Sequence, residues 1–159
     1  MKTGLSTGLT RVHRPKSPVV VGLIVLVTVI GAFLPRDHTA SRAIGLHQPP
    51  ETVWATIRNL AGTAAWFPEG ARVEVEVVED RRPTKLVTRV VTGPRAPFGG
   101  TWTYELQLAP GGSRLTITER GWIAVPPFRV VAHLMGLDTT IKSYLTALAK
   151  KFGEAPAIQ

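Results

Sequence analysis

The segment Arg42-Ala-Ile-Gly-Leu-His-Gln-Pro-Pro-Glu-Thr-Val-Trp54 changes from a strand pattern to a helix pattern within a few residues. Residues 42–46 are predicted to form a first strand, which the prolines after His47 would end. Pro50 suits the first turn of a helix, and Glu51 suits its positive end. We expect this helix to run from about Pro50 to Leu60, because one face carries apolar side chains at helical spacing: Val53, Trp54, Ile57 and Leu60.

Downstream of this helix, the pattern changes to the period of two that is typical of strands. Residues 61–66 are expected to add a short helical turn, and the stretches 73–77, 86–91, 101–108 and 115–122 then alternate between apolar and polar side chains. Short turns such as Ala109-Pro-Gly-Gly112 separate these stretches. Consecutive strands joined by short turns predict an antiparallel meander.

The C-terminal part reads as one long helix that begins at Pro126-Pro127 and continues to about Phe152. Its apolar side chains form two stripes: Phe128, Val131 and Met135 in the first half, and Ile141, Leu145, Leu148 and Phe152 in the second. We expect a kink between them, with Asp138 capping the renewed helix and Gly153 ending it. The predicted fold is therefore α+β, with a curved antiparallel sheet wrapped around the C-terminal helix and a cavity between the two.

Upstream of the domain, Val19–Leu34 contains no charged residue and is bracketed by Pro18 and Pro35. A helix over residues 18–35 would be about 27 Å long, close to the thickness of a hydrocarbon core of about 30 Å. We therefore expect a transmembrane helix at 18–35, preceded by a basic tail at 1–17 and followed by a polar stalk at 36–41. A single domain at 42–153 and a short tail at 154–159 would complete the chain.

The charges on either side of the hydrophobic segment predict its orientation. Four bases precede it without an acid, whereas Asp37 partly offsets the bases that follow it, Arg36 and Arg42. This asymmetry favours a cytoplasmic N-terminus and an extracytoplasmic domain. Two alternatives are a cleaved signal peptide with Ile30-Gly31-Ala32 near the cleavage site, and a buried core helix, which the absence of a polar face disfavours.

Composition excludes several classes of function. The chain has 159 residues and a net charge of +8, and the four bases of the tail, Lys2, Arg11, Arg14 and Lys16, supply half of that charge. The domain itself is only mildly basic and carries no nucleic-acid-binding motif, so we expect no nucleic-acid partner. The absence of Cys rules out disulfides, and the scattered histidines offer no metal-ligand spacing, so no metal and no cofactor is expected.

At this point the sequence resembles a known superfamily. The run His47-Gln-Pro-Pro-Glu-Thr-Val-Trp54 after a first strand is similar to the entry motif of START/Bet v 1-like (SRPBCC) domains, which include polyketide cyclase/dehydrase and lipid-transport proteins. Leu115-Thr-Ile-Thr-Glu-Arg-Gly121, and Pro127-Phe128 leading into Thr139-Thr-Ile-Lys-Ser-Tyr-Leu145, also fit. The resemblance covers about residues 38 to 153. It implies a helix-grip fold around a hydrophobic cavity, and one or two more strands than the pattern shows, for which 92–98 and 123–125 are the candidate positions.

Glu119 is the most informative candidate for the site. Strand alternation places it on the same face as Leu115 and Ile117, where a carboxylate needs a partner or a raised pKa. It would orient a polar group of a ligand or act as an acid or base; alternatively, the strand bulges near Gly121 and Glu119 faces water or pairs with an arginine. Tyr104 and Thr88 share inward positions and could supply hydroxyl groups.

The other ligand-binding candidates are apolar: Trp66, Phe67, Trp102, Ile117, Phe128 and Met135. We expect Trp66 and Phe67 at the entrance, whereas Trp54 is expected in the core. No nucleophile–base set is present, so the favoured function is a membrane-anchored, non-enzymatic binder or carrier of a lipid, quinone, sterol-like molecule or polyketide. Two alternatives are a polyketide cyclase or dehydratase that uses Glu119 and Tyr104 as acid/base groups, and an envelope interaction module with a filled core.

Overall fold

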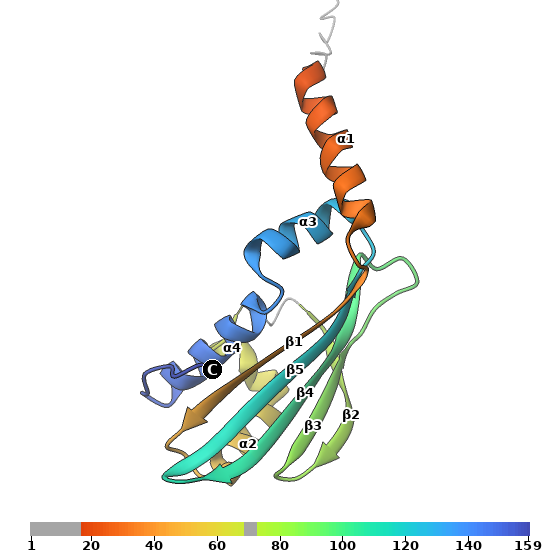
Figure 1. The fold of residues 1–159 in the computed structure, drawn as a ribbon. Helices are drawn as coiled ribbons and strands as arrows, with labels where there is room; N and C mark the ends of the chain where they lie inside the picture. Colours follow the sequence, from red (N-terminus) through yellow and green to blue (C-terminus); the bar gives the residue numbers. More distant parts are fainter. Residues whose placement is uncertain (1–16, 69–72) are drawn as a thin grey trace, which may run out of the picture.

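The computed structural model describes residues 17–68 and 73–159. In chain order the elements are α1 (Pro18–Phe33), β1 (Asp37–Leu46), α2 (Pro50–Arg58), the 3-10 helix η1 (Leu60–Ala65), β2 (Val75–Arg81), β3 (Lys85–Val90), β4 (Phe98–Ala109), β5 (Gly112–Ile123), α3 (Pro126–Met135) and α4 (Thr139–Lys151) (Figure 1). This order confirms the predicted α+β class.

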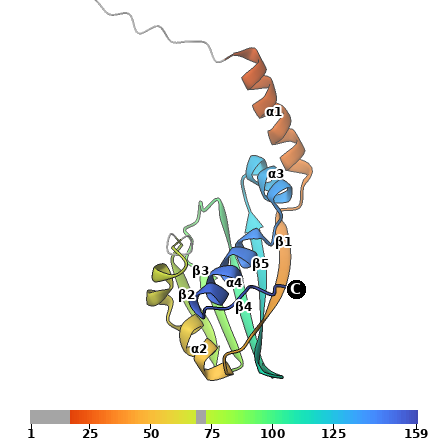
Figure 2. The same cartoon turned by 90° about the vertical axis from the view of Figure 1, so that its left-hand side faces the viewer.

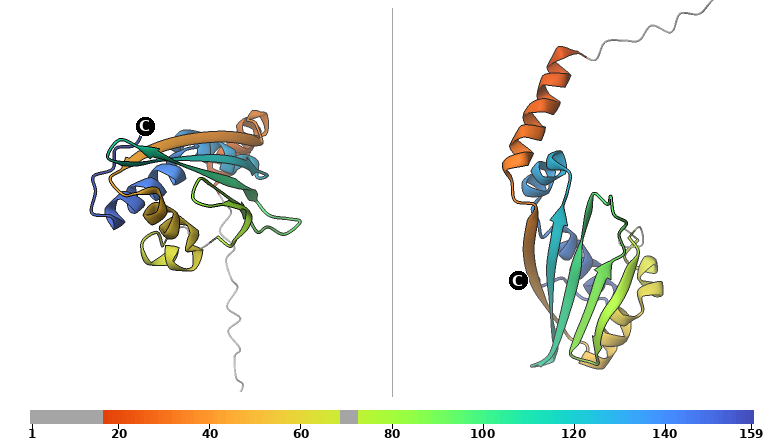
Figure 3. Two further views of the ribbon diagram at one scale, coloured as in Figure 1. Left: turned by 90° about the horizontal axis from the view of Figure 1, so that it is seen from below. Right: turned by 90° about the vertical axis from the view of Figure 1, so that its right-hand side faces the viewer.

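The strands form one antiparallel sheet in the order β1-β5-β4-β3-β2. The sheet is curved, and α2, η1 and α4 lie on its concave side (Figures 2 and 3). The meander is confirmed for β2 to β5, whereas β1 crosses over to pair with β5. The described residues contain five strands, so the additional strand implied by the resemblance is not found. Phe98 and Ile123, at its two candidate positions, instead pair with each other and lengthen β4 and β5.

The core lies between the concave face of the sheet and the two helices α2 and α4. The helices contribute Val53, Trp54, Ile57, Ile141, Tyr144, Leu145, Leu148 and Ala149, and the sheet contributes Ile44, Leu46, Leu86, Tyr104, Leu106, Leu115 and Ile117. The predicted apolar face of α2 is thus correct, except that α2 ends at Arg58. The Asn59 side chain accepts a hydrogen bond from the Gly62 N–H at 3.0 Å and starts η1 separately.

The C-terminal segment is two helices rather than one kinked helix. Gly136 breaks it at φ 91°, a conformation that only glycine adopts readily. Asp138 occupies the N-cap position of α4 as predicted, but its side chain makes no cap and contacts Arg42 and Lys142 instead. The prediction that the sheet wraps around the whole C-terminal helix is wrong for its first half, because α3 has no buried residue and Phe128, Val131 and Met135 are all about half exposed or more.

The N-terminal helix ends earlier than predicted and leads directly into the sheet. Leu34 is extended, at ψ 144°, because a residue that precedes proline avoids the helical conformation. β1 begins at Asp37, so the predicted stalk at 36–41 is wrong and most of it belongs to the sheet. At the other end of the chain, Gln159 pairs with the Ala43 backbone at 2.8 and 3.1 Å, and the predicted C-terminal tail therefore closes against the edge of β1.

α1 extends away from the domain and contributes no large side chain to the core (Figure 1). Its large apolar residues from Val19 to Phe33 are exposed, except for the partly buried Val27, which contradicts the core-helix alternative. Within residues 17–68 and 73–159, no helix combines the length and the apolar character needed to cross a membrane. The predicted basic tail lies outside the described residues, apart from Ser17.

Candidate functional site

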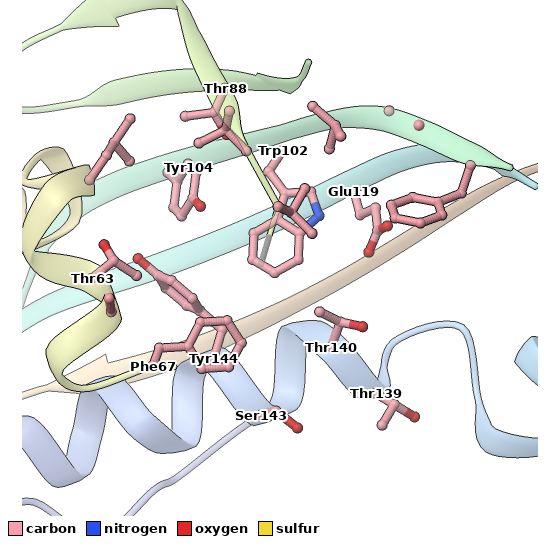
Figure 4. Close-up of a pocket in the computed structure, with 18 of the residues that line it drawn as sticks. Thr63, Phe67, Thr88, Trp102, Tyr104, Glu119, Thr139, Thr140, Ser143 and Tyr144 are labelled. Carbon is pink, nitrogen blue, oxygen red and sulfur yellow. The ribbon is translucent and has the colours of Figure 1, made fainter. Parts of the chain in front are cut away.

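A cavity of about 790 Å³ lies between the concave face of the sheet, η1 and the first turns of α4. Its apolar wall includes Leu60, Ala61, Ala64, Phe67, Val73, Val75, Val90 and Phe98. Its polar residues come from all three elements: Thr63, Thr88, Tyr104, Glu119, Thr139, Thr140, Ser143 and Tyr144 (Figure 4). A hollow that is mainly apolar, with a small number of convergent polar groups, is the usual form of a small-molecule site.

Glu119 points into this cavity from β5, as the alternation predicted. Its Oε1 atom lies 3.6 Å from Nε2 of His38 on the neighbouring strand β1, and the Glu119 side chain is 21 % exposed. The indole nitrogen of Trp102 is turned toward the same carboxylate in Figure 4. Burial raises the pKa of Glu119 above its ordinary value, and His38 and Trp102 oppose that rise. The alternatives of a solvent-facing Glu119 and of an arginine partner are therefore wrong.

Gly121 makes the contact between His38 and Glu119 possible. His38 and Gly121 are directly opposite each other in the β1–β5 register, and a Cβ atom at position 121 would lie 2.7 Å from Cε1 of the imidazole. The predicted bulge near Gly121 is absent, because the β4–β5 register continues unbroken through this position. Glycine is thus needed here for the space it leaves above the strand.

A group of hydroxyls lies further along the cavity, around Tyr104 and Tyr144. The two tyrosine rings are 5.8 Å apart and buried, and Thr88 lines the same cavity. Burial raises the pKa of Tyr104 and of Tyr144 well above the ordinary value. Both phenols are therefore neutral at physiological pH, and each offers a ligand one hydrogen-bond donor and one acceptor.

Tyr144 is also the centre of an aromatic cluster. Its ring contacts four others in edge-on geometry, with centroid distances of 5.1 Å to Trp66, 5.3 Å to Phe67, 5.6 Å to Trp102 and 5.8 Å to Tyr104. These are favourable distances for aromatic pairs. The cluster joins η1 and the loop after it to both α4 and β4, and it fixes the shape of one side of the cavity.

The structure brings five of the predicted site residues together in the cavity wall: Phe67, Thr88, Trp102, Tyr104 and Glu119. The other four lie elsewhere. Ile117 is fully buried in the core, and Trp66 lines a shallower groove on the outer side of α4 with Lys142 and Thr146. Phe128 and Met135 are on α3, away from the cavity wall.

Sequence reasoning missed the polar face that α4 turns to the cavity. Thr139, Thr140, Ser143 and Tyr144 line the cavity, and Tyr144 lies three residues after Ile141, next to the predicted apolar stripe. The helical period could therefore have identified Tyr144 as an inward residue. The hydroxyl groups beside it gave no such signal, because threonine and serine are equally common on exposed helix faces.

One exposed part of the cavity wall is at the end of the sheet where β4 begins and β5 ends, and we name it the mouth; the exposed Ala61 and Ala64 of η1 form another. Phe98, at the start of β4, lines the cavity and is 47 % exposed, and Thr140 on α4 is also exposed. Phe98 pairs with Ile123, and the Ile123 N–H donates to the Arg36 carbonyl at 2.9 Å. The mouth and the base of α1 are therefore neighbours.

No known family profile matches this sequence. Solved structures nevertheless share the fold. A protein from Mesorhizobium loti superposes with a TM-score of 0.57 at 14 % identity, over 73 % of this chain and 97 % of that one. The Aha1 dimer from Colwellia psychrerythraea gives 0.54 at 14 % identity, over 70 % and 92 % of the two chains.

A third similar structure is StfQ, a di-domain aromatase/cyclase from the steffimycin biosynthetic pathway. It gives a TM-score of 0.52 at 11 % identity, over 74 % of this chain and 52 % of StfQ. The domain therefore has the helix-grip fold of Aha1-like and aromatase/cyclase structures. At these identities the likeness concerns the fold alone.

The arrangement can bind and orient a molecule. Among the described residues, no group of three or more His, Asp or Glu side chains is placed to hold a metal ion. The polar groups at the cavity are one carboxyl with a raised pKa, an imidazole behind it and a set of neutral hydroxyls. Such groups form hydrogen bonds with an uncharged ligand, and an isolated carboxyl of raised pKa can also donate or accept a proton.

Proposed function

We propose that this protein binds a hydrophobic small molecule in the cavity between the sheet and α4, at or near a membrane. The observation that carries the proposal is the cavity itself. Its volume of about 790 Å³ falls within the range of roughly 300–1,000 Å³ that is typical of small-molecule sites. An interaction module with a filled core does not account for such a hollow.

The polar groups indicate the class of ligand. Glu119 near the mouth favours a hydroxyl or another hydrogen-bond donor, and the neutral phenols of Tyr104 and Tyr144 favour an oxygen acceptor further inside. A strongly anionic ligand would be disfavoured beside Glu119. An amphiphile with an apolar body and oxygen functions fits these groups, which includes neutral lipids, quinones, sterol-like molecules and polyketides.

Attachment to lipid is proposed from the exposed surface of α1. Large apolar side chains cover its sides from Val19 to Phe33, and a continuous apolar surface of this kind rarely faces water. Together with the basic residues that precede it, this surface supports a signal anchor with a cytoplasmic N-terminus and an extracytoplasmic domain. Retention of the full-length chain in membranes after carbonate washing is expected, whereas release of a shortened chain would indicate a cleaved signal peptide.

One observation supports a second candidate, a cyclase- or dehydratase-like enzyme. Glu119 and Tyr104 line the same cavity, and burial raises the pKa of both. Since Tyr104 is neutral, its hydroxyl would donate a hydrogen bond to a carbonyl oxygen, and Glu119 would act as the base. Loss of turnover with retained binding in Glu119→Gln would favour this candidate.

The experiment that tests binding is native mass spectrometry of the full-length protein, extracted in mild detergent, followed by analysis of the extracted lipids. We expect a co-purifying hydrophobic molecule. Ser143→Trp should expel it, because position 143 lines the cavity. Lys150→Trp, at an exposed position on the same helix, is the matched control and should retain it. A protein that carries the same molecules with Ser143→Trp as without it would contradict the proposal.

A further inference from the structure

α3 is a helix whose apolar side chains have no partner in the domain. None of its residues is buried, and its main contacts are with α1. Phe128, Val131, Leu134 and Met135 are 54 %, 49 %, 82 % and 67 % exposed. Figures 1 and 2 show α3 across the end of the sheet, at the base of α1. Stability of the core therefore does not explain why α3 is apolar.

The joint between α3 and α1 is close-packed and specifically hydrogen-bonded. The space between Gly31 and the Pro126 carbonyl is too small for even a methyl group. The Arg129 guanidinium donates to the carbonyls of Leu34 at 3.2 Å, Ile123 at 2.8 Å and Ala124 at 3.0 Å. These carbonyls belong to the ends of α1 and β5, so one side chain fixes α3 relative to both.

The other end of α3 is joined to the cavity wall. The hydroxyl of Thr139, which lines the cavity, donates to the Met135 carbonyl at 2.6 Å and to the Gly136 carbonyl at 2.8 Å. Phe98, the exposed aromatic residue of the mouth, belongs to the same end of the sheet. α1, α3 and the mouth therefore lie at the same end of the domain. We name the exposed apolar side chains at this end the apical surface: Phe33, Phe98, Phe128, Val131, Leu134 and Met135.

We infer that the apical surface rests on the lipid bilayer into which α1 inserts, with α3 as an interfacial helix, so that the cavity opens toward the membrane. A ligand then passes between lipid and cavity without crossing bulk water. This inference rests on the lipid attachment of α1 proposed above, and it narrows the ligand class to molecules that reside in the bilayer. Interfacial helices of this type bury their apolar face by about 5–10 Å in the headgroup and acyl boundary.

Continuity with α1 favours lipid over a second copy of the chain as the occupant. Whatever medium surrounds the exposed side chains of α1 also reaches α3, because the two helices are fixed together at Gly31 and Arg129. The polar groups of the same end suit headgroups: Arg36 stacks over the Trp122 ring at 4.9 Å, and Arg95 is exposed in the β3–β4 loop. Asp37 and Glu74, which is exposed directly before β2, are acidic exceptions. An aromatic ring with a paired cation is typical of the membrane–water interface.

The chain contains no cysteine, so single-cysteine variants report one position each. Full-length Leu134→Cys would be labelled with an environment-sensitive fluorophore and reconstituted into phosphatidylcholine/phosphatidylglycerol vesicles. We expect several-fold stronger quenching by doxyl-labelled lipids than by aqueous iodide. The matched control is Leu108→Cys, an equally exposed leucine (81 %) at the opposite end of β4, where iodide should be the stronger quencher.

Two results would overturn the inference. If iodide quenches the label on Leu134→Cys as efficiently as it quenches the label on Leu108→Cys, α3 lies in water. Protection from both quenchers that disappears when the protein is diluted in the vesicles would identify a second copy of the chain as the occupant.

A second measurement separates this inference from the proposed binding function. Vesicles that contain a diazirine-tailed phosphatidylcholine are irradiated, and the adducts on the full-length protein are mapped by mass spectrometry. The Leu134→Asp/Met135→Asp variant should lose most cavity adducts, whereas Leu108→Asp should keep them. If doxyl lipids quench the Leu134→Cys label but no adduct forms in the cavity, the result would support contact of the apical surface with the membrane. It would count against lipid binding in the cavity. Cavity adducts that are unaffected by Leu134→Asp/Met135→Asp would support binding and overturn entry from the membrane.

Discussion

Nε2 of His38 and Oε1 of Glu119 are 3.6 Å apart across two neighbouring strands, at the edge of a mainly apolar cavity. A histidine beside a buried carboxyl partly offsets the cost of ionising it. Burial is nevertheless the larger effect, and the pKa of Glu119 is raised overall. The pair therefore makes the charge of the cavity depend on pH.

The first prediction concerns stability and pH. Because the folded pKa of Glu119 is above its unfolded value, the folded state binds the proton more strongly. The contribution of this group to stability is complete below the unfolded pKa, and it is lost as pH rises through the raised folded pKa. Glu119→Gln should remove this loss, so its melting temperature relative to that of the unmodified protein should rise as the pH increases from the ordinary pKa of a glutamate, about 4.5, through the raised pKa of Glu119. Thermal unfolding of both full-length proteins in detergent micelles, at a series of pH values, measures this difference in melting temperature. An unchanged difference over that range would contradict the raised pKa.

The second prediction concerns the space above Gly121. In Gly121→Ala, the new methyl group would push the His38 imidazole away from Glu119, because the ring is the part that can move. Since His38 lowers the pKa of Glu119, the substitution should raise that pKa further. Carboxyl-carbon NMR titration measures the change, and His38→Ala should reproduce it. Gly45→Ala, on β1 where a Cβ meets no atom within 4 Å, is the control and should leave the titration as it is.

The fold was predictable where local periodicity reports burial. Strand alternation placed Glu119, Tyr104 and Thr88 on the inner face, and helical spacing identified the face of α2. Periodicity failed where an apolar stripe is not packed in the core, as on α3. The apolar residues of α3 have the same helical spacing as those of α4. Spacing alone does not distinguish a side chain that packs on the sheet from one that stays exposed. Gly136 was the local signal, since its positive φ separates the two helices.

The start of β1 illustrates a second limit. Residues 37–41 are polar enough to resemble a stalk, yet they form the first half of an edge strand, with burial alternating along it. Pairing with β5 stabilises this strand through the backbone, from Asp37 opposite Trp122 onward. Such long-range pairing leaves little trace in the local sequence. His38 was missed as part of the site for the same reason.

The third prediction separates the ring of Tyr144 from its hydroxyl. Tyr144→Ala should destabilise the protein by about 3–5 kcal/mol, since it leaves a cavity at the centre of the aromatic cluster. Tyr144→Phe keeps the ring contacts and should cost only about 1 kcal/mol, while weakening the binding of a ligand that uses the hydroxyl. Urea unfolding in micelles measures the first effect, and retention of the co-purifying molecule measures the second. Equal destabilisation by the two variants would show that the ring contacts contribute little.

The last prediction concerns Arg129, which joins α1, β5 and α3 through hydrogen bonds to carbonyl oxygens. A guanidinium can donate hydrogen bonds to several acceptors at once because its N–H groups are spread over a planar group. An ammonium has all its N–H groups on one nitrogen atom. Arg129→Ala should therefore cost about 2–3 kcal/mol, the scale of hydrogen bonds from a charged donor, and Arg129→Lys should recover only a small part of it. Amide hydrogen exchange of the full-length protein should show faster exchange at residues 31–36 and 123–126 in both variants, with the core of α4 unchanged.

Arg114→Ala, which removes an exposed arginine from β5, should leave the exchange at these residues as it is. Full protection of 31–36 in Arg129→Ala would mean that packing of Gly31 against Pro126 alone holds α1 to the domain, and that the guanidinium is dispensable for the joint.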